Sequence, residues 1–76
     1  MYKIYFENSR KEWKEVGAGT ERECRKAMME FLNSKHFKSY YSNEYDIDVG
    51  VRRIDVGSHT EFFYLIDMSK ATLKVT

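Results

Sequence analysis

The first apolar residues of the chain alternate with polar ones, which is the pattern of a β-strand that buries one face. Tyr2, Ile4 and Phe6 share one side of this strand. Tyr5 makes the other side less polar than that of an ordinary surface strand. We therefore predict a strand near the start of the chain with one apolar face and a second face that is partly aromatic.

A second strand is predicted over residues 12–18, after a polar turn at 8–11. Trp13 and Val16 are its largest apolar residues, and they lie three positions apart. A regular strand turns residues at this spacing to opposite faces. Either a bulge intervenes, or Trp13 points away from the side on which the helix packs.

A helix is predicted to follow the two glycines that end this strand. Thr20 and Glu23 have the spacing of a capping box, in which each side chain accepts a hydrogen bond from the main-chain N–H of the other residue. One apolar stripe then recurs at helical spacing and consists of Cys24, Ala27, Met28, Phe31 and Leu32. The predicted helix ends near Lys35, because Phe37 would fall on its polar side.

A third strand is predicted from the alternation of apolar and polar residues over 45–51. The alternation slips by one position at 52–53 and resumes as far as Val56. One extra residue in the strand, a β-bulge, is the simplest explanation of that slip.

The most apolar segment of the chain, residues 60–67, is predicted to be a strand that follows a hairpin loop at 57–59. Its two faces are both apolar, with Phe62, Tyr64 and Ile66 on one and Phe63 and Leu65 on the other. A short edge strand over 71–75 is predicted after it.

These elements predict a single domain over residues 1–76 of the α+β class. One amphipathic helix packs on a mostly antiparallel sheet of four to five strands, in the order β-β-α-β-β-(β). Two strand orders remain open at this point. One is a β-grasp-like order, in which the first strand is central beside a parallel neighbour, and the other is a meander split around the helix.

Composition agrees with one small domain that has no covalent or metal cross-link. The chain has 76 residues, 42% of them hydrophobic, and one cysteine. Cys24 has no partner for a disulfide, and with two histidines it falls short of a structural zinc site, so we expect a buried thiol and neither metal nor cofactor. No segment approaches the ~20 apolar residues of a membrane span, and a cytoplasmic protein is expected.

Charge and motifs argue against several functional classes. Thirteen Lys and Arg against twelve Asp and Glu give a net charge of +1, so no overall attraction to nucleic acid or to a membrane is expected. There is no glycine-rich phosphate loop or metal-spaced histidine pair, and His59 has no acid placed to orient it. We predict that the chain is not an enzyme.

Acidic residues recur at every second position of the predicted third strand, as Glu44, Asp46 and Asp48. They would project about 7 Å apart from one side of the strand. Such a row is a solvated strand face, a set of Mg²⁺ ligands, or negative charge that mimics phosphate toward a basic partner. We prefer charge mimicry to metal binding, because no other carboxylate can be placed beside the row. The partner would then be a nucleic-acid-binding host protein.

Cationic and aromatic side chains gather in the segment after the helix. Cations for phosphates and rings for bases are typical of surfaces that bind single-stranded nucleic acid. In the alternative interpretation, Phe37 and one tyrosine close the core and the lysines compensate the helix dipole. A small nucleic-acid-binding accessory protein is thus our second hypothesis, and its binding residues would be Lys35, Lys38, Tyr40, Tyr41, Arg52 and Arg53.

The predicted sheet has more apolar side chains than one helix can cover. With the helix on one face, the other face is predicted to gather Tyr5, Trp13, Phe63 and Leu65. An exposed apolar patch of this kind marks a protein interface. Alternatively, the sheet curls enough to bury these rings beneath its own loop. Trp13 is the leading anchor, because tryptophan and tyrosine are enriched at the energetic centres of interfaces.

No motif identifies a family. In its small size, single domain and lack of a catalytic set, the chain resembles in type the small proteins with which phages and mobile elements block host machinery, anti-CRISPR proteins among them. This resemblance covers no specific residue. We predict a non-enzymatic, protein-binding inhibitor that occludes a host protein through the aromatic face and the acidic row, with self-association as a dimer through the same face as a further outcome.

Overall fold

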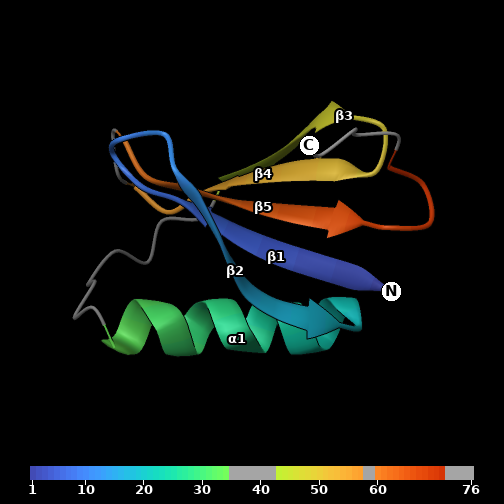
Figure 1. Ribbon diagram of the computed structural model, residues 1–76, viewed down its shortest axis with the longest axis horizontal. Coiled ribbons are helices and arrows are strands. Elements are labelled where there is room, and N and C mark those ends of the chain that lie inside the picture. The colour runs from blue at the N-terminus through green and yellow to red at the C-terminus, as the bar shows by residue number, and fades with distance from the viewer. Residues whose placement is uncertain (35–42, 58–59, 72–76) are drawn as a thin grey trace.

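A computed structural model describes residues 1–34, 43–57 and 60–71, which form a five-stranded sheet with one helix on one side (Figure 1). The elements are β1 (Tyr2–Glu7), β2 (Trp13–Gly19), α1 (Glu21–Ser34), β3 (Asn43–Asp48), β4 (Val51–Asp55) and β5 (Phe62–Asp67). The strand order is β2-β1-β5-β4-β3, and every neighbouring pair is antiparallel. The predicted α+β fold is confirmed. The β-grasp-like order is wrong, because β1 lies between two antiparallel neighbours.

The hairpin of β1 and β2 contains a β-bulge. Ile4 pairs with Gly17 and Tyr5 pairs with Glu15, which leaves Val16 as the extra residue. Trp13 points away from the helix and packs with aromatic rings on the opposite face, whereas Val16 packs against the core. Regular alternation from Trp13 to Val16 already gives these opposite faces, so the second of the two alternatives explains their spacing.

Helix α1 begins at the predicted capping box. The Glu23 N–H donates to Thr20 Oγ1 at 3.1 Å, and the Thr20 N–H donates to Glu23 Oε1 at 3.0 Å. Its predicted stripe is confirmed, since Cys24, Met28 and Leu32 are buried. Burial raises the pKa of the Cys24 thiol, as expected of a structural cysteine. In the part of the chain that the structure describes, no helix is long and apolar enough to cross a membrane.

The core lies between α1 and the near face of the sheet (Figure 1). Its buried strand residues come mainly from β1, β5 and β4, and the helix packs most closely against β2 and β1. The helix packs close to the sheet at Gly17, where a Cβ would lie 2.7 Å from the Cβ of Ala27. Phe63 and Leu65 belong to this core and are 0% and 4% exposed, so their predicted place on the opposite face is wrong. The reason is the register of β5, which pairs Phe63 with Phe6 and Leu65 with Ile4.

The predicted long strand over 45–56 is also wrong, because it is a hairpin. β3 and β4 pair with each other, and Gly50 makes the turn between them with a φ of 72°, a conformation that favours glycine. The slip of the pattern at 52–53 lies inside β4, because Val51 packs on the sheet face away from α1 and Ile54 packs in the core on the helix side. The pairing of β4 with β5 is regular there, so the predicted bulge at 52–53 is wrong. A bulge does occur nearby, between Asp46 and Asp48 in β3. Ile47 and Val49, whose alternation suggested a buried face, are exposed.

Some sequence predictions fall outside the described residues. They are the helix end at Lys35, the cationic and aromatic segment with Lys38, Tyr40 and Tyr41, the turn residue His59, and all but Ala71 of the edge strand over 71–75. α1 is described as far as Ser34.

Candidate functional site

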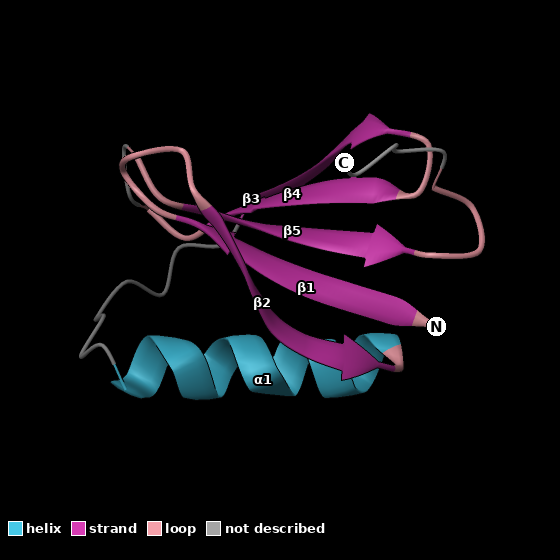
Figure 2. Ribbon diagram, in the orientation of Figure 1, coloured by secondary structure: helices cyan, strands magenta, loops and turns pink. Residues whose placement is uncertain are grey.

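The strand register gathers aromatic side chains on the sheet face opposite α1, which we call the helix-free face (Figure 2). One row across all five strands consists of Glu15, Tyr5, Tyr64, Arg53 and Tyr45. The adjacent row consists of Trp13, Glu7, Phe62, Asp55 and Asn43. Directly paired side chains in antiparallel strands lie close enough to interact. Two of the predicted interface residues, Tyr5 and Trp13, therefore lie side by side, while Phe63 and Leu65 lie on the other face.

Trp13 lies flat across this face. Its ring is stacked on Tyr64, with 4.1 Å between the ring centroids and 14° between the planes. Trp13 belongs to β2 and Tyr64 to β5, with β1 between them, so the indole reaches over β1 to meet Tyr64. The Tyr5 ring lies 5.8 Å away. Trp13 remains 43% exposed, which leaves a large aromatic surface open to solvent.

A buried carboxylate joins these rings. Glu7 is 7% exposed, and its Oε2 accepts a hydrogen bond from Trp13 Nε1 at 3.0 Å. Its Oε1 accepts one from the Tyr64 hydroxyl at 2.9 Å. Burial, together with this bond, raises the pKa of Tyr64 to about 12, so the hydroxyl stays protonated and donates at neutral pH. A buried carboxylate is costly unless it is hydrogen-bonded, and these two donors meet that need.

The helix-free face is partly closed by its own side chains. Val51, Tyr64 and Ile66 form a small second core on this side, with Tyr5 packed against it. Tyr64 is therefore buried on this face and Tyr5 is partly buried. Trp13 and Tyr45 at the outer strand stay exposed, at 43% and 41%.

The two adjacent arginines point to opposite faces of β4. Arg53 lies on the helix-free face with its guanidinium 3.7 Å from the centre of the Phe62 ring. Arg52 lies on the helix side, where its Nε donates to Asp46 at 3.1 Å. Since alternate residues of a strand face opposite ways, the pair cannot form one basic patch. The predicted nucleic-acid residues that the structure describes are thereby separated.

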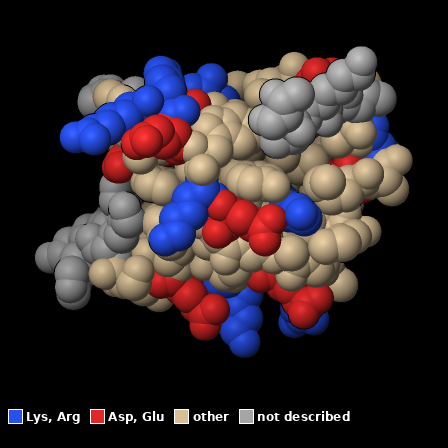
Figure 3. All heavy atoms as spheres, viewed as in Figure 1, with Lys and Arg blue, Asp and Glu red and all other residues tan. Residues whose placement is uncertain are grey.

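The acidic row is divided and largely paired. Glu44 accepts two hydrogen bonds from Arg25, at 2.7 and 2.9 Å, and Asp46 pairs with Arg52. Asp48 lies beyond the bulge of β3, opposite Val51, and accepts from the Val49 N–H at 2.7 Å. Acidic and basic side chains lie next to one another at several places on the molecular face in Figure 3. The described residues include no group of three or more acidic, histidine or cysteine side chains that could hold a metal ion.

The Arg25–Glu44 bridge connects α1 to the outer strand β3, and we expect it to make stability depend on pH. Hydrogen bonds from Arg25 lower the pKa of Glu44 below the ordinary value of about 4.3. The bridge therefore contributes in full above that value and is lost as the pH falls through the lower, folded value. Replacing Glu44→Gln should lower the free energy of unfolding by about 1 kcal/mol at pH 7, as measured by urea denaturation.

The same denaturation series at lower pH provides the control. The difference between the wild type and the Glu44 variant should shrink between about pH 5 and pH 3, as the wild-type carboxyl becomes protonated. Glu15→Gln is a matched variant, because Glu15 forms a more exposed ion pair with Lys3 at 3.3 Å and should change stability little. An unchanged gap between the wild type and the Glu44 variant over this range would show that the effect of Glu44 does not come from its ionised bridge to Arg25.

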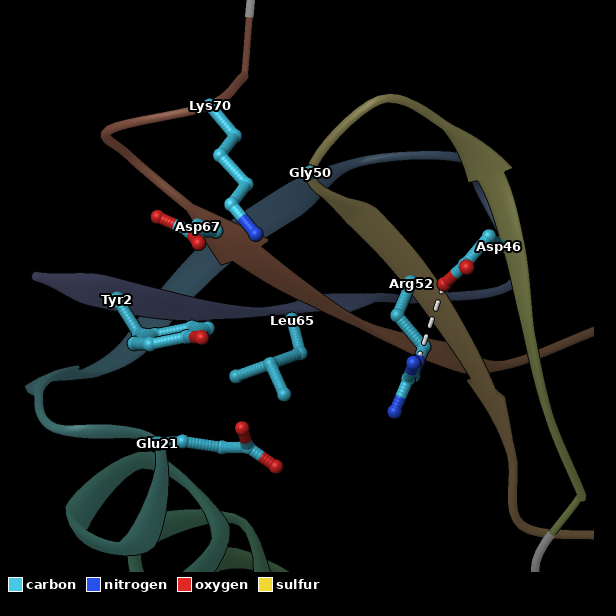
Figure 4. A pocket seen from close by; sticks show the side chains of 8 residues that line it. All are labelled: Tyr2, Glu21, Asp46, Gly50, Arg52, Leu65, Asp67 and Lys70. Carbon is cyan, nitrogen blue, oxygen red and sulfur yellow. Dashed lines mark hydrogen bonds and ion pairs between the residues drawn. The ribbon is translucent and has the colours of Figure 1, made fainter.

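A hollow of about 190 Å³ lies on the helix side, between the start of α1 and the β3–β4 hairpin (Figure 4). Leu65 and Tyr2 line it together with charged side chains of both signs. Its carboxylates are already engaged. Asp46 pairs with Arg52, Glu21 pairs with Arg25, and Asp67 accepts hydrogen bonds from the N–H and the hydroxyl of Ser69. All three carboxylates therefore make contacts within the chain.

Glu7, Tyr64, Phe62 and Tyr45 are members of the helix-free face that the sequence analysis did not single out. Glu7 could be identified from the sequence pattern, because it alternates with Phe6 and therefore shares a strand face with Tyr5. The place of Tyr64 depends on the β1–β5 register, for which the chain has no local signal.

Comparison with protein-family models, with curated proteins and with solved structures finds no match. The function therefore has to be argued from the geometry of the helix-free face.

Proposed function

We propose that this chain is a non-enzymatic binding protein that docks on a partner protein through its helix-free face, with Trp13 as the anchor. The observation that carries the proposal is the state of Trp13, which is 43% exposed yet fixed by a ring stack and a hydrogen bond. Fixing a side chain before binding reduces the entropy that association costs. An exposed aromatic ring held in this way is the arrangement expected of an interface anchor.

The composition of the face favours a protein partner over nucleic acid. Tryptophan, tyrosine and arginine are the residues most enriched at the energetic centres of protein interfaces, and Trp13, Tyr5 and Arg53 lie together here. Phosphate binding needs several free cations. On this face Lys3 is paired with Glu15, and Arg53 is stacked on Phe62.

The proposed mode of action is occlusion of the partner's own binding surface, as in the small inhibitors of phages and mobile elements, within the cytoplasm. A nucleic-acid-binding host protein is a partner of the proposed kind. We leave Glu44 and Asp46 out of the docking surface, because Arg25 and Arg52 engage them on the helix side. Asp48 remains at the margin of the proposed docking surface.

The experiment that tests this proposal begins with capture from a lysate of the native host, where mass spectrometry names the bound proteins. Each is then purified and titrated against the chain by calorimetry. We expect one of them to form a stoichiometric complex at micromolar concentration or below, and sedimentation to show whether the chain also pairs with itself. Labelled single and double strands are titrated in parallel at two salt concentrations. Salt-sensitive binding to a strand, without any protein complex, would contradict the proposal.

A further inference from the structure

The polar atoms of the aromatic cluster converge on Glu7. The Trp13 ring comes from an edge strand, and the Tyr64 ring comes from the middle of the sheet, with Glu7 on the strand between them. Each ring donates to a different oxygen of the same carboxylate, at 3.0 and 2.9 Å. The carboxylate thus holds two stacked rings in one arrangement.

We infer that Glu7 is the positioning residue of the helix-free face: its buried carboxylate holds the Trp13 indole flat across β1, so that a partner meets a ring whose orientation is already set. This inference rests on the proposed function, because it concerns how Trp13 is presented for docking. Stacking on Tyr64 alone would permit two orientations of the indole, because a half-turn about χ2 keeps the ring plane but moves the N–H to the other edge. The bond from Nε1 to Glu7 selects one of them.

The arrangement also limits what a partner can offer to Trp13. The indole has a single donor, its N–H, and that donor is engaged by Glu7. One ring face is covered by Tyr64. The partner therefore contacts the outer ring face by a flat contact, of the kind made by an aliphatic side chain or a guanidinium plane, and makes no hydrogen bond to the indole.

The test uses Trp13 as its own reporter, because it is the only tryptophan of the chain. Glu7→Leu keeps a side chain of similar size and removes both acceptor oxygens, so the indole N–H loses its hydrogen bond. In the free protein we expect hydrogen exchange of the indole N–H to become about tenfold faster, the factor that corresponds to one lost hydrogen bond. Acrylamide quenching of Trp13 fluorescence should increase with it.

Two further variants complete the series. Glu15→Gln removes a carboxylate from the same face, one row away and paired with Lys3, and should leave indole exchange unchanged. Tyr64→Phe retains the stacked ring and removes only the other donor to Glu7. It should speed indole exchange less than Glu7→Leu does, and it serves as the test if the Glu7 variant fails to fold.

Affinity for the purified partner is measured on the same proteins, and Glu7→Leu should weaken it about tenfold. Indole exchange and quenching that match the wild type in both the Glu7 and Tyr64 variants would overturn the positioning role. Faster exchange with unchanged partner affinity would support Glu7 as the residue that holds Trp13, and would instead contradict docking through Trp13. The two failures are thus distinguishable.

Discussion

Replacing Trp13 with Ala is expected to weaken binding of the purified partner by roughly 30-fold or more, which corresponds to the ~2 kcal/mol of an interface anchor. The indole supplies the largest exposed aromatic surface of the helix-free face and is already ordered by Tyr64 and Glu7. The partner would lose that contact surface. Calorimetric titration of the wild type and the variant at one temperature, at which circular dichroism shows both to be folded, measures the effect.

Met29→Ala is the matched control for this prediction. Met29 is 49% exposed on α1 and does not belong to the core, so its removal deletes a comparable exposed apolar side chain. Its affinity should stay within about twofold of the wild type. Equal losses for the two variants would mean that binding depends on general surface hydrophobicity and that Trp13 is not an anchor.

Replacing Phe63 with Ala should destabilise the fold by about 3–5 kcal/mol, the usual cost of removing a buried phenylalanine. Phe63 is completely buried and its ring packs against Phe6 at 5.2 Å and Phe31 at 5.8 Å between centroids. A chain of this length has a total stability of roughly 4–11 kcal/mol. The loss is a large part of that total, so urea denaturation should show a transition midpoint far below that of the wild type, or no folded baseline at all.

The neighbouring residue gives the control for that prediction. Phe62→Ala removes a ring of the same size from the opposite face, where it is only partly buried. It should cost about 1–2 kcal/mol, since less surface is buried there. A Phe62 variant less stable than the Phe63 variant would show that the assignment of the two faces of β5 is wrong.

The helix could be predicted in detail because each of its signals is local. The capping box at Thr20 and Glu23 satisfies main-chain N–H groups within four residues. The stripe that begins at Cys24 depends only on helical spacing. Neither signal requires knowledge of what lies across the core.

The faces of β5 could not be predicted, because both of its sides are apolar. Alternation tells which residues share a face but does not say which face meets the helix. Pairing with β1 decides this by placing Phe63 beside Phe6. Such long-range pairing leaves no mark in the local pattern, and Phe63 and Leu65 were assigned to the wrong side for this reason.

The β3–β4 hairpin was missed for a related reason. Apolar residues continue to alternate through its turn, at Ile47 and Val49, although both are exposed. A single glycine, Gly50, provides the turn signal.

For the candidate site, Tyr5 and Trp13 could be identified from the alternation of β1 and the spacing in β2. Their partners Glu7 and Tyr64 required the register.

The most direct test of docking through the helix-free face is an NMR footprint of the chain with its purified partner. The indole N–H of Trp13 gives one resolved signal, because the chain has one tryptophan. On complex formation we predict that this signal and those of Tyr5 and Arg53 change most, while signals around Met29 on α1 stay in place. Changes concentrated around Met29, with the Trp13 signal unmoved, would contradict the proposed docking face.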